Sequence, residues 1–280
     1  MTRLHALFIL LAFWAAIYLP GLGSTELKGE EGRRILPAVT MLDSGNWLVP
    51  YVGGEPYFRK PPLVNWLIAG SMKLTGVRNE WAARLPSVLC VLALGLVVVV
   101  VCSRWLGVRT ALAAGLFAIA NVSMIEKGRL AEIEAIYVAL AGIGMVIWMA
   151  WALRGGDASP AKEEQQAQVS SWLLWTVPFV FLGLAALAKG PVHLLFFYAL
   201  VLAVPRGRRE FISLPHLTGL LLMAGIFACW AVPYFEAAGA MRGEETQASA
   251  AGVWYEQAAE RFGGGSFVLS DWLLSLPART

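Results

Sequence analysis

The segment GEEGRRILPAVTMLDSGNWLVPYVGGEPYFRKPPL, residues 29–63, decides how this chain is organised, because nearly everything around it is apolar. Charged side chains gather toward its two ends: Glu30, Glu31, Arg33, Arg34, Arg59 and Lys60. Charge is costly beside a bilayer unless it is solvated or used. We therefore expect this loop to be the working part of the protein and the surrounding helices to hold it in place.

The composition indicates an all-α polytopic membrane protein. Of the 280 residues, 58% are hydrophobic and 15% are charged, whereas soluble domains carry about 25% charged residues. The N-terminal apolar run lacks a clear small-residue cleavage site, so it predicts an uncleaved first transmembrane helix. The cysteines lie in apolar runs without zinc or disulfide spacing. We expect no metal site built from them, and no nucleic-acid partner.

Seven segments are apolar enough, or nearly so, to cross a membrane, which takes about 20 residues of helix: 4–20, 84–102, 109–125, 132–153, 171–188, 190–205 and 214–236. The fifth and sixth meet at Lys189, Gly190 and Pro191, which predict a tight turn. Residues 63–75 are apolar but too short, and we expect them to form a helix lying in the interface, with Trp66 at headgroup depth.

The positive-inside rule predicts the orientation. With a cytoplasmic N-terminus, the basic loop 205–215 and the polar loop 154–170 lie inside, and the loop 21–83 and the tail 237–280 lie outside. If residues 63–75 crossed the membrane, the basic loop would face outward instead. The charge bias therefore favours an interfacial helix and a periplasmic or extracellular first loop.

Two more charged residues belong to the expected outer side. Lys189 is a lone charge between two apolar spans, and Glu134 lies about one turn into the fourth span. A carboxylate at that depth needs a partner or a polar cavity. It could form a buried pair with Arg129 or Lys127 that only fixes helix packing, or it could serve a reaction. The charge pattern leaves both interpretations open.

Several ordered motifs now resemble a known family. They are E-E-x-R, M-L-x-S-G-N-W-L-V-P and G-E-P-Y-F-x-K-P-P-L in the first loop, N-E-W-A-A-R-L-P-S at 79–87, and L-A-K-G-P at 187–191. The set resembles the bacterial membrane glycosyltransferases of the GT-C architecture, the branch with aminoarabinose transferase and relatives of protein mannosyltransferases. The resemblance implies one transmembrane domain over 1–280, with about seven spans plus interfacial helices in the first loop. Because relatives are longer, we expect this chain to be their N-terminal half.

The resemblance implies inverting transfer of a sugar from a polyprenyl-phosphate carrier to a lipid, glycan or protein acceptor on the outer face of the inner membrane. It places Glu30 at the position of the family's catalytic acid, usually Asp, with Glu31 beside it and Glu134 as a further carboxylate. Arg59 stands where some relatives carry Glu, so a metal contact proposed there does not carry over. No cofactor is assigned, although a divalent metal stays open.

The residue types fit that chemistry. A departing phosphate needs positive charge close by, which Lys60, Arg59 and Lys189 could supply. Arg33 and Arg34 could bind the donor, pair with the carboxylates, or form a solvated face that meets lipid phosphates. A carboxylate beside an acceptor hydroxyl can act as a general base.

Other features stay open. Residues 30–43 have the apolar spacing of an amphipathic helix, but Pro37 implies either a start near Leu36 or a kink. Trp47, Tyr51, Tyr57 and Phe58 could stack on a sugar, although anchoring at the membrane interface is the commoner role of such aromatics. The competing functions are a transporter and a non-catalytic membrane partner.

Overall fold

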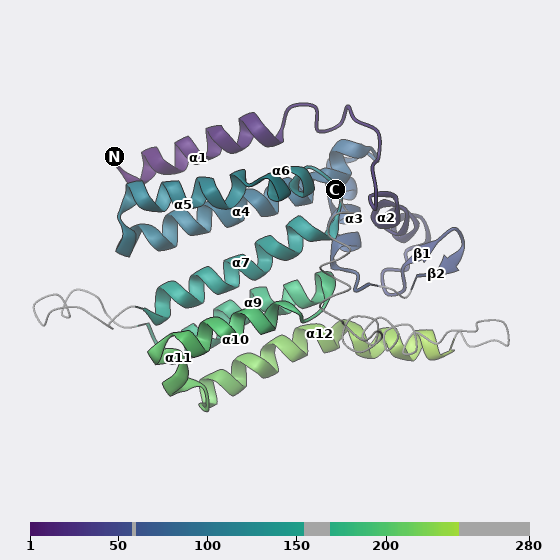
Figure 1. Ribbon diagram of the computed structural model, residues 1–280. Helices are drawn as coiled ribbons and strands as arrows, with labels where there is room; N and C mark the ends of the chain where they lie inside the picture. Colours follow the sequence, from purple (N-terminus) through teal and green to yellow (C-terminus); the bar gives the residue numbers. More distant parts are fainter. Residues whose placement is uncertain (58–59, 154–168, 241–280) are drawn as a thin grey trace, which may run out of the picture.

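The computed structural model describes residues 1–57, 60–153 and 169–240 (Figure 1). Arg59, Phe58, most of the expected inner loop and most of the expected outer tail lie outside the described residues. The described chain is mainly helical, and its only strands are the two of an antiparallel hairpin, β1 (Tyr51–Val52) and β2 (Glu55–Pro56).

Long helices lie side by side and run along one common direction (Figure 1). In chain order they are α1 (Arg3–Tyr18), α4 (Glu80–Leu106), α5 (Val108–Ala120), α6 (Val122–Gly128), α7 (Ile133–Ala152), α9 (Ser171–Lys189), α10 (His193–Ala203) and α12 (Leu214–Ala240). The helices α2 (Gly32–Ser44) and α3 (Leu63–Thr75) cover one end of this bundle together with the hairpin, and α11 (Pro205–Glu210) lies at the other end.

The expected polytopic membrane protein is confirmed. Within the described ranges, α4, α7, α9 and α12 are long and apolar enough to cross a membrane, and the bent pair α5–α6 gives a fifth span if it is counted as one. The shorter apolar helices α1 and α10 have 16 and 11 residues, so the exact count of seven spans is not established.

The expected third span, residues 109–125, is corrected: it breaks at Asn121, where α5 and α6 meet at an angle of 60°. The Asn121 side chain accepts a hydrogen bond from the backbone N–H of Met124 at 2.9 Å, the arrangement of a helix N-cap. The new helix also includes Glu126 and Lys127, which the sequence predicted as part of a turn.

The tight turn between the fifth and sixth apolar segments is confirmed. Helix α9 ends at Lys189, and Gly190 follows with φ +106. Its N–H donates to the carbonyl of Ala186 at 2.8 Å. Because a side chain is strained at this φ, the glycine lets Lys189 end the helix and lets Pro191 begin the return.

The amphipathic segment of the first loop forms one helix, α2, which begins at Gly32 and continues through Pro37. The sequence left open a start near Leu36, with Glu30 in a loop, or a kink; the helix begins earlier, at Gly32, and Glu30 still lies in the turn before it. Proline has no N–H, so the carbonyl of Arg33 lacks its helical partner. The helix ends at Gly45, φ +70, whose N–H donates to Met41.

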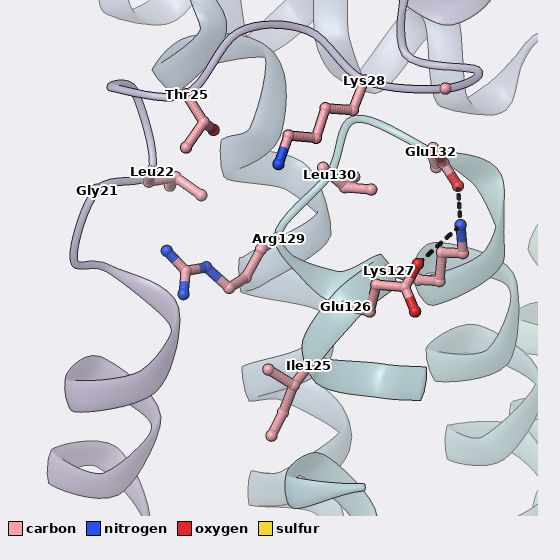
Figure 2. Close-up of a pocket in the computed structure, with 11 residues that line it drawn as sticks. Gly21, Leu22, Thr25, Lys28, Ile125, Glu126, Lys127, Arg129, Leu130 and Glu132 are labelled. Atoms are coloured by element: carbon pink, nitrogen blue, oxygen red, sulfur yellow. Dashed lines mark ion pairs between the residues drawn. The ribbon is translucent and has the colours of Figure 1, made fainter. Parts of the chain in front are cut away.

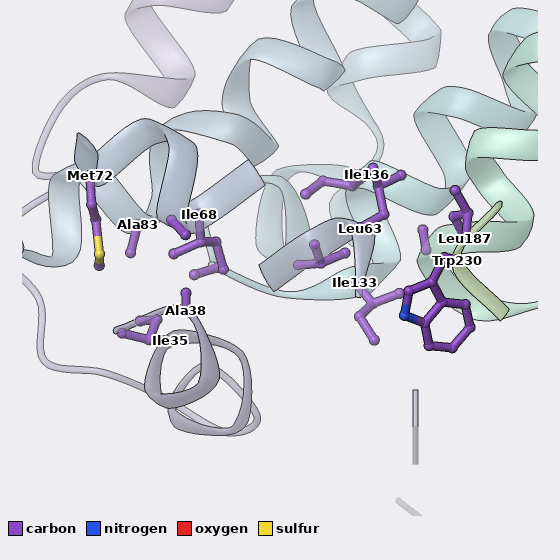
Figure 3. Close-up of a cluster of buried hydrophobic side chains, with 14 of the residues drawn as sticks. Ile35, Ala38, Leu63, Ile68, Met72, Ala83, Ile133, Ile136, Leu187 and Trp230 are labelled. Atoms are coloured by element: carbon purple, nitrogen blue, oxygen red, sulfur yellow. The ribbon is translucent and has the colours of Figure 1, made fainter. Parts of the chain in front are cut away.

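A shared apolar core fixes the first loop to the bundle (Figure 3). Buried side chains of α2 and α3 pack against the ends of α4, α7, α9 and α12; those labelled in Figure 3 include Ile35, Ala38, Ile68, Met72, Ala83, Ile136, Leu187 and Trp230. Burying an Ile or Met side chain fully contributes roughly 1.5–3 kcal/mol. This packing holds the charged residues of the loop near the starts and ends of the long helices.

Candidate functional site

The deepest charged pair of the first loop joins Glu31 to Arg84 of α4. Both side chains are buried, at 0% and 1% exposed. The guanidinium donates from Nε to Oε1 and from Nη2 to Oε2 of the carboxylate, each at 2.8 Å. Such a two-point pair is the strongest geometry that these groups form, and it offsets the cost of taking both charges out of water.

Both partners of this pair bind backbone as well. Glu31 accepts hydrogen bonds from the N–H groups of Ala131 and Lys28, each at 2.8 Å. Arg84 donates to the carbonyls of Leu22, Thr25 and Glu26, at 2.8, 3.0 and 3.0 Å, and to the Thr25 hydroxyl. The pair therefore ties together the loop after α1, the start of α4 and the turn before α7.

These contacts set the charge state of Glu31. Burial by itself raises the pKa of this carboxyl, but hydrogen bonds from Arg84, Ala131 and Lys28 outweigh it and hold the pKa below its ordinary value. The sequence offered Arg33 or Arg34 as partners of the Glu30 and Glu31 carboxylates, and for Glu31 the structure corrects this to Arg84. The sequence did contain a signal for this pair: Arg84 is a charged residue about one turn inside α4, which is otherwise mostly apolar.

Glu30 lies just before α2 and remains accessible, with its side chain 49% exposed. Arg33 donates from Nη1 to both carboxylate oxygens at 2.9 and 3.1 Å, and Arg34 Nη2 lies 3.8 Å from Oε2. An exposed ion pair of this kind is weak. Glu30 can therefore exchange its Arg33 contact for another partner at little cost.

Arg34 is a buried cation, 6% exposed at its side chain. Its Nη1 donates to the hydroxyl of Tyr57 at 3.1 Å, and its guanidinium lies 5.8 Å from the centre of that ring. The Asn65 side chain donates to the Arg34 carbonyl at 2.8 Å and fixes its backbone. Within the described residues its Nε has no hydrogen-bond partner, which is uncommon for a buried polar atom.

Glu134 of α7 pairs with Lys189 at the end of α9, with Nζ 3.1 Å from Oε1. The sequence considered Arg129 or Lys127 as its partner, and this is corrected. Lys127 instead lies 3.2 Å from Glu132. Glu132 is the extended residue before α7 and Glu134 lies in its first turn, and the two carboxylates have different partners, Lys127 and Lys189.

The Glu134–Lys189 pair is part of a larger polar group. Both side chains are partly exposed, at 42% and 33%. The Lys189 amine lies 5.6 Å from the centre of the Tyr137 ring, and the apolar neighbours of these charges, Ile35, Ile133 and Leu187, belong to one buried cluster. Residues of the first loop, α7 and α9 are thus brought together at one end of the bundle.

The remaining predicted residues are placed as follows. Lys60 is half-buried directly before Pro61 and the start of α3. Trp47 and Tyr51 pack against the buried apolar cluster of the first loop. Tyr57 instead accepts a hydrogen bond from Arg34. In the described part of the chain, no three His, Cys, Asp or Glu side chains cluster as metal ligands would.

The sequence is similar to a family of membrane glycosyltransferases and to individual bacterial proteins. The sequence profile described as Dolichyl-phosphate-mannose-protein mannosyltransferase matches residues 59–232. An uncharacterized protein of Aquifex aeolicus is 26% identical over 200 residues, which are 69% of this chain and 36% of that protein. The undecaprenyl phosphate-alpha-4-amino-4-deoxy-L-arabinose arabinosyl transferase of Shewanella sediminis is 35% identical over 79 residues, 28% of this chain and 14% of that one.

The fold has a solved counterpart. The crystal structure of ArnT from Cupriavidus metallidurans bound to undecaprenyl phosphate superposes with a TM-score of 0.67 at 22% identity, over 83% of this chain and 42% of that one. Its apo state gives a TM-score of 0.62. In each of these comparisons the chain covers less than half of the relative's length.

Proposed function

The chain belongs to the dolichyl-phosphate-mannose-protein mannosyltransferase family, and from this premise we propose that it forms the donor-binding and catalytic part of an inverting glycosyltransferase of the inner membrane. The donor is a polyprenyl-phosphate sugar, and the acceptor is a lipid, glycan or protein on the outer face. The observation that carries the proposal is that two charged pairs, Glu30 with Arg34 and Glu134 with Lys189, lie at the end of the bundle where α2, α7 and α9 share a buried cluster.

In the proposed reaction, an acceptor hydroxyl attacks the anomeric carbon of the sugar from the side opposite the phosphate. The bond from that carbon to the phosphate oxygen breaks, and its electron pair stays on the leaving phosphate. The hydroxyl proton passes to Glu30, which acts as general base. The accessibility of Glu30 and the weakness of its Arg33 contact support this role.

The leaving phosphate gains negative charge as the bond breaks, so fixed cations nearby stabilise the transition state. We assign this role to Lys60, Lys189 and Arg34, with Arg59 and Arg33 as further donor contacts. The Nε of Arg34, which has no hydrogen-bond partner among the described residues, supports its part. Glu134 then sets the position of the Lys189 amine rather than touching the acceptor.

Glu31 was a catalytic candidate in the sequence, but its contacts support a positioning role. Both carboxylate oxygens already accept hydrogen bonds from Arg84 and from backbone. A base must have an accessible lone pair for the proton that it removes. We therefore propose that Glu31 fixes the backbone next to Glu30 and does not react.

A transfer assay tests the function. Membranes that contain the protein are supplied with radiolabelled polyprenyl-phosphate sugars, and both label transfer and donor binding are measured. Glu30→Gln is expected to lower transfer by roughly 10²–10⁴, the usual effect of a positioned base, with donor binding little changed. The control is Glu55→Gln, an exposed carboxylate of the hairpin. Donor movement across the membrane without transfer would favour the transporter, and donor binding with neither would favour a non-catalytic partner.

A further inference from the structure

A pocket of about 540 Å³ lies between the loop after α1 and the segment that joins α6 to α7 (Figure 2). It is separate from the polar group around Lys189, because Glu132 faces this pocket whereas Glu134 pairs with Lys189. Three cations line it: Lys28, Lys127 and Arg129. The proposed transfer reaction uses none of them.

The charges of the pocket are separated into two groups. Lys127 is compensated, because its amine lies 3.5 Å from Glu126 and 3.2 Å from Glu132. Figure 2 shows these three side chains together, and Lys28 and Arg129 on the other side of the pocket. No ion pair of Lys28 or Arg129 is formed within the described residues. The lining as a whole has three cations and two carboxylates, and its excess of positive charge lies with Lys28 and Arg129.

The two cations are held in place by the loop around them. The Lys28 backbone N–H donates to Glu31 at 2.8 Å, so the buried Glu31–Arg84 pair fixes the residue that carries this amine. Arg129 Nη2 donates to the carbonyl of Pro20. A guanidinium has five N–H donors, so this bond leaves others for a ligand. Figure 2 shows the Lys28 amine extending into the space between Thr25, Leu130 and Arg129.

Backbone conformation keeps this side of the pocket open. Gly21 has φ +65, and a Cβ there would lie 3.9 Å from Arg129 Nη2 and 3.1 Å from the Ser24 hydroxyl. A side chain at this position would be strained and would press on the Ser24 hydroxyl. The glycine thus lets the turn after α1 bring the Pro20 carbonyl to Arg129 without filling the space beside it.

We propose that Lys28 and Arg129 bind a phosphate group in this pocket, as a second anion site apart from the one that receives the donor. Arginine matches phosphate oxygens with its fork of N–H groups, and lysine adds a point charge. The pocket lies beside the ends of α1 and α6, and lysine or arginine side chains near the ends of apolar helices can reach the membrane interface, where lipid phosphates lie. The phosphate comes either from an anionic lipid headgroup or from a soluble phosphate.

The experiment compares two probes on the purified full chain in detergent. Phosphatidylglycerol binding is measured by native mass spectrometry, with phosphatidylcholine as the reference lipid, and inorganic phosphate binding by equilibrium dialysis. Lys28→Ala is expected to weaken binding of at least one probe by tenfold or more, and Arg129→Lys to retain more binding than Arg129→Ala. The matched control is Lys73→Ala, an exposed lysine of α3.

The two probes identify the source of the phosphate. A loss confined to phosphatidylglycerol assigns a lipid headgroup, and a loss confined to inorganic phosphate assigns a soluble ligand. Unchanged binding of both probes by Lys28→Ala, or an equal loss in Lys73→Ala, overturns the proposal. Melting temperatures of all variants are compared to confirm that each variant is folded. Lys28→Ala is the decisive variant, because it leaves the hydrogen bond between Arg129 and Pro20 in place.

Discussion

The carboxylate of Glu31 and the guanidinium of Arg84 lie 53 positions apart in the chain and form a buried two-point ion pair. The same two side chains bind the backbone at Leu22, Thr25, Glu26, Lys28 and Ala131. One pair thus positions the turn that carries Glu30 and the turn that carries Lys28. The proposed reaction centre and the proposed phosphate pocket depend on the same anchor.

Removing one partner of this pair should destabilise the protein strongly. Arg84→Met leaves the Glu31 carboxylate buried and uncompensated, which costs about 3–5 kcal/mol in comparable cases. Thermal unfolding in detergent should show a large fall in Tm. The control is Arg33→Met, which removes an exposed pair worth about 0–1 kcal/mol. Equal shifts for the two variants would contradict the anchoring role.

The same pair predicts a pH dependence. The pKa of Glu31 is lowered from its ordinary value of 4.5 in the folded protein, so the folded state favours the charged form. Its contribution is complete above about pH 4.5 and is lost as pH falls through the lower, folded-state pKa. The difference in Tm between wild type and Glu31→Gln should therefore shrink in that acidic range. A difference that stays constant down to pH 3 would show that charge is not the cause.

Local sequence signals predicted much of the fold. The apolar segments became helices, the Lys189-Gly190-Pro191 turn formed as expected, and residues 63–75 form a helix. The break at Asn121 was missed, because apolar periodicity continues across it and only the capping side chain marks the new start. An Asn within an apolar run, followed by Val and Ser, was the available signal.

The partners of the site residues were harder to predict from sequence. Neighbouring cations were considered for Glu134, but its partner Lys189 is 55 positions away, and Arg84 is 53 positions from Glu31. Such contacts depend on how the helices pack and on the face of each helix on which a side chain lies. Periodicity describes a single helix, so it could indicate that Glu134 needs a partner without identifying Lys189.

The orientation of the protein is a further prediction. Positive charges on α11 favour a cytoplasmic location for that helix, and the hairpin should lie outside. Single cysteines at Arg209 and Glu55, both exposed, are suitable labelling sites once Cys90, Cys102 and Cys229 are replaced. Gly207 is unsuitable, because a Cβ there would lie 2.3 Å from the Val201 carbonyl oxygen.

An impermeant thiol reagent applied to intact cells should label the cysteine at position 55 and leave that at 209 unlabelled until the membrane is opened. Each variant serves as the control for the other, because both must be labelled after permeabilisation. Labelling at 209 from outside would reverse the orientation and would place the proposed reaction centre in the cytoplasm.

Donor binding should depend on the proposed phosphate contacts. Lys60→Ala and Lys189→Ala each remove one charge-assisted contact, worth about 1.5–3 kcal/mol, so the Kd for a polyprenyl-phosphate sugar should rise roughly tenfold or more. Arg208→Ala, an exposed cation at the opposite end of the bundle, should leave it unchanged. Unaltered affinity in both lysine variants would make these residues structural.

Exchanging Glu134 and Lys189 separates packing from chemistry. The single variants Glu134→Lys and Lys189→Glu each place like charges 3.1 Å apart in the present geometry, so both should lose stability. The double exchange restores an ion pair between α7 and α9 and should recover the Tm. If Lys189 serves the donor phosphate, the exchanged protein should bind donor at least tenfold less tightly and transfer sugar at least tenfold more slowly, even with its Tm recovered. The reason is that the amine is then attached to α7 and no longer to the end of α9.

The matched control for that experiment is the exchange of Asp43 and Arg78, an exposed pair at the same end of the protein, which should change neither Tm nor transfer. Recovery of full transfer by the Glu134–Lys189 exchange would show that the pair only holds α7 against α9. Recovery of Tm without transfer would instead locate the role of Lys189 in the reaction, because a purely structural pair works in either direction whereas a phosphate contact requires the amine at one position.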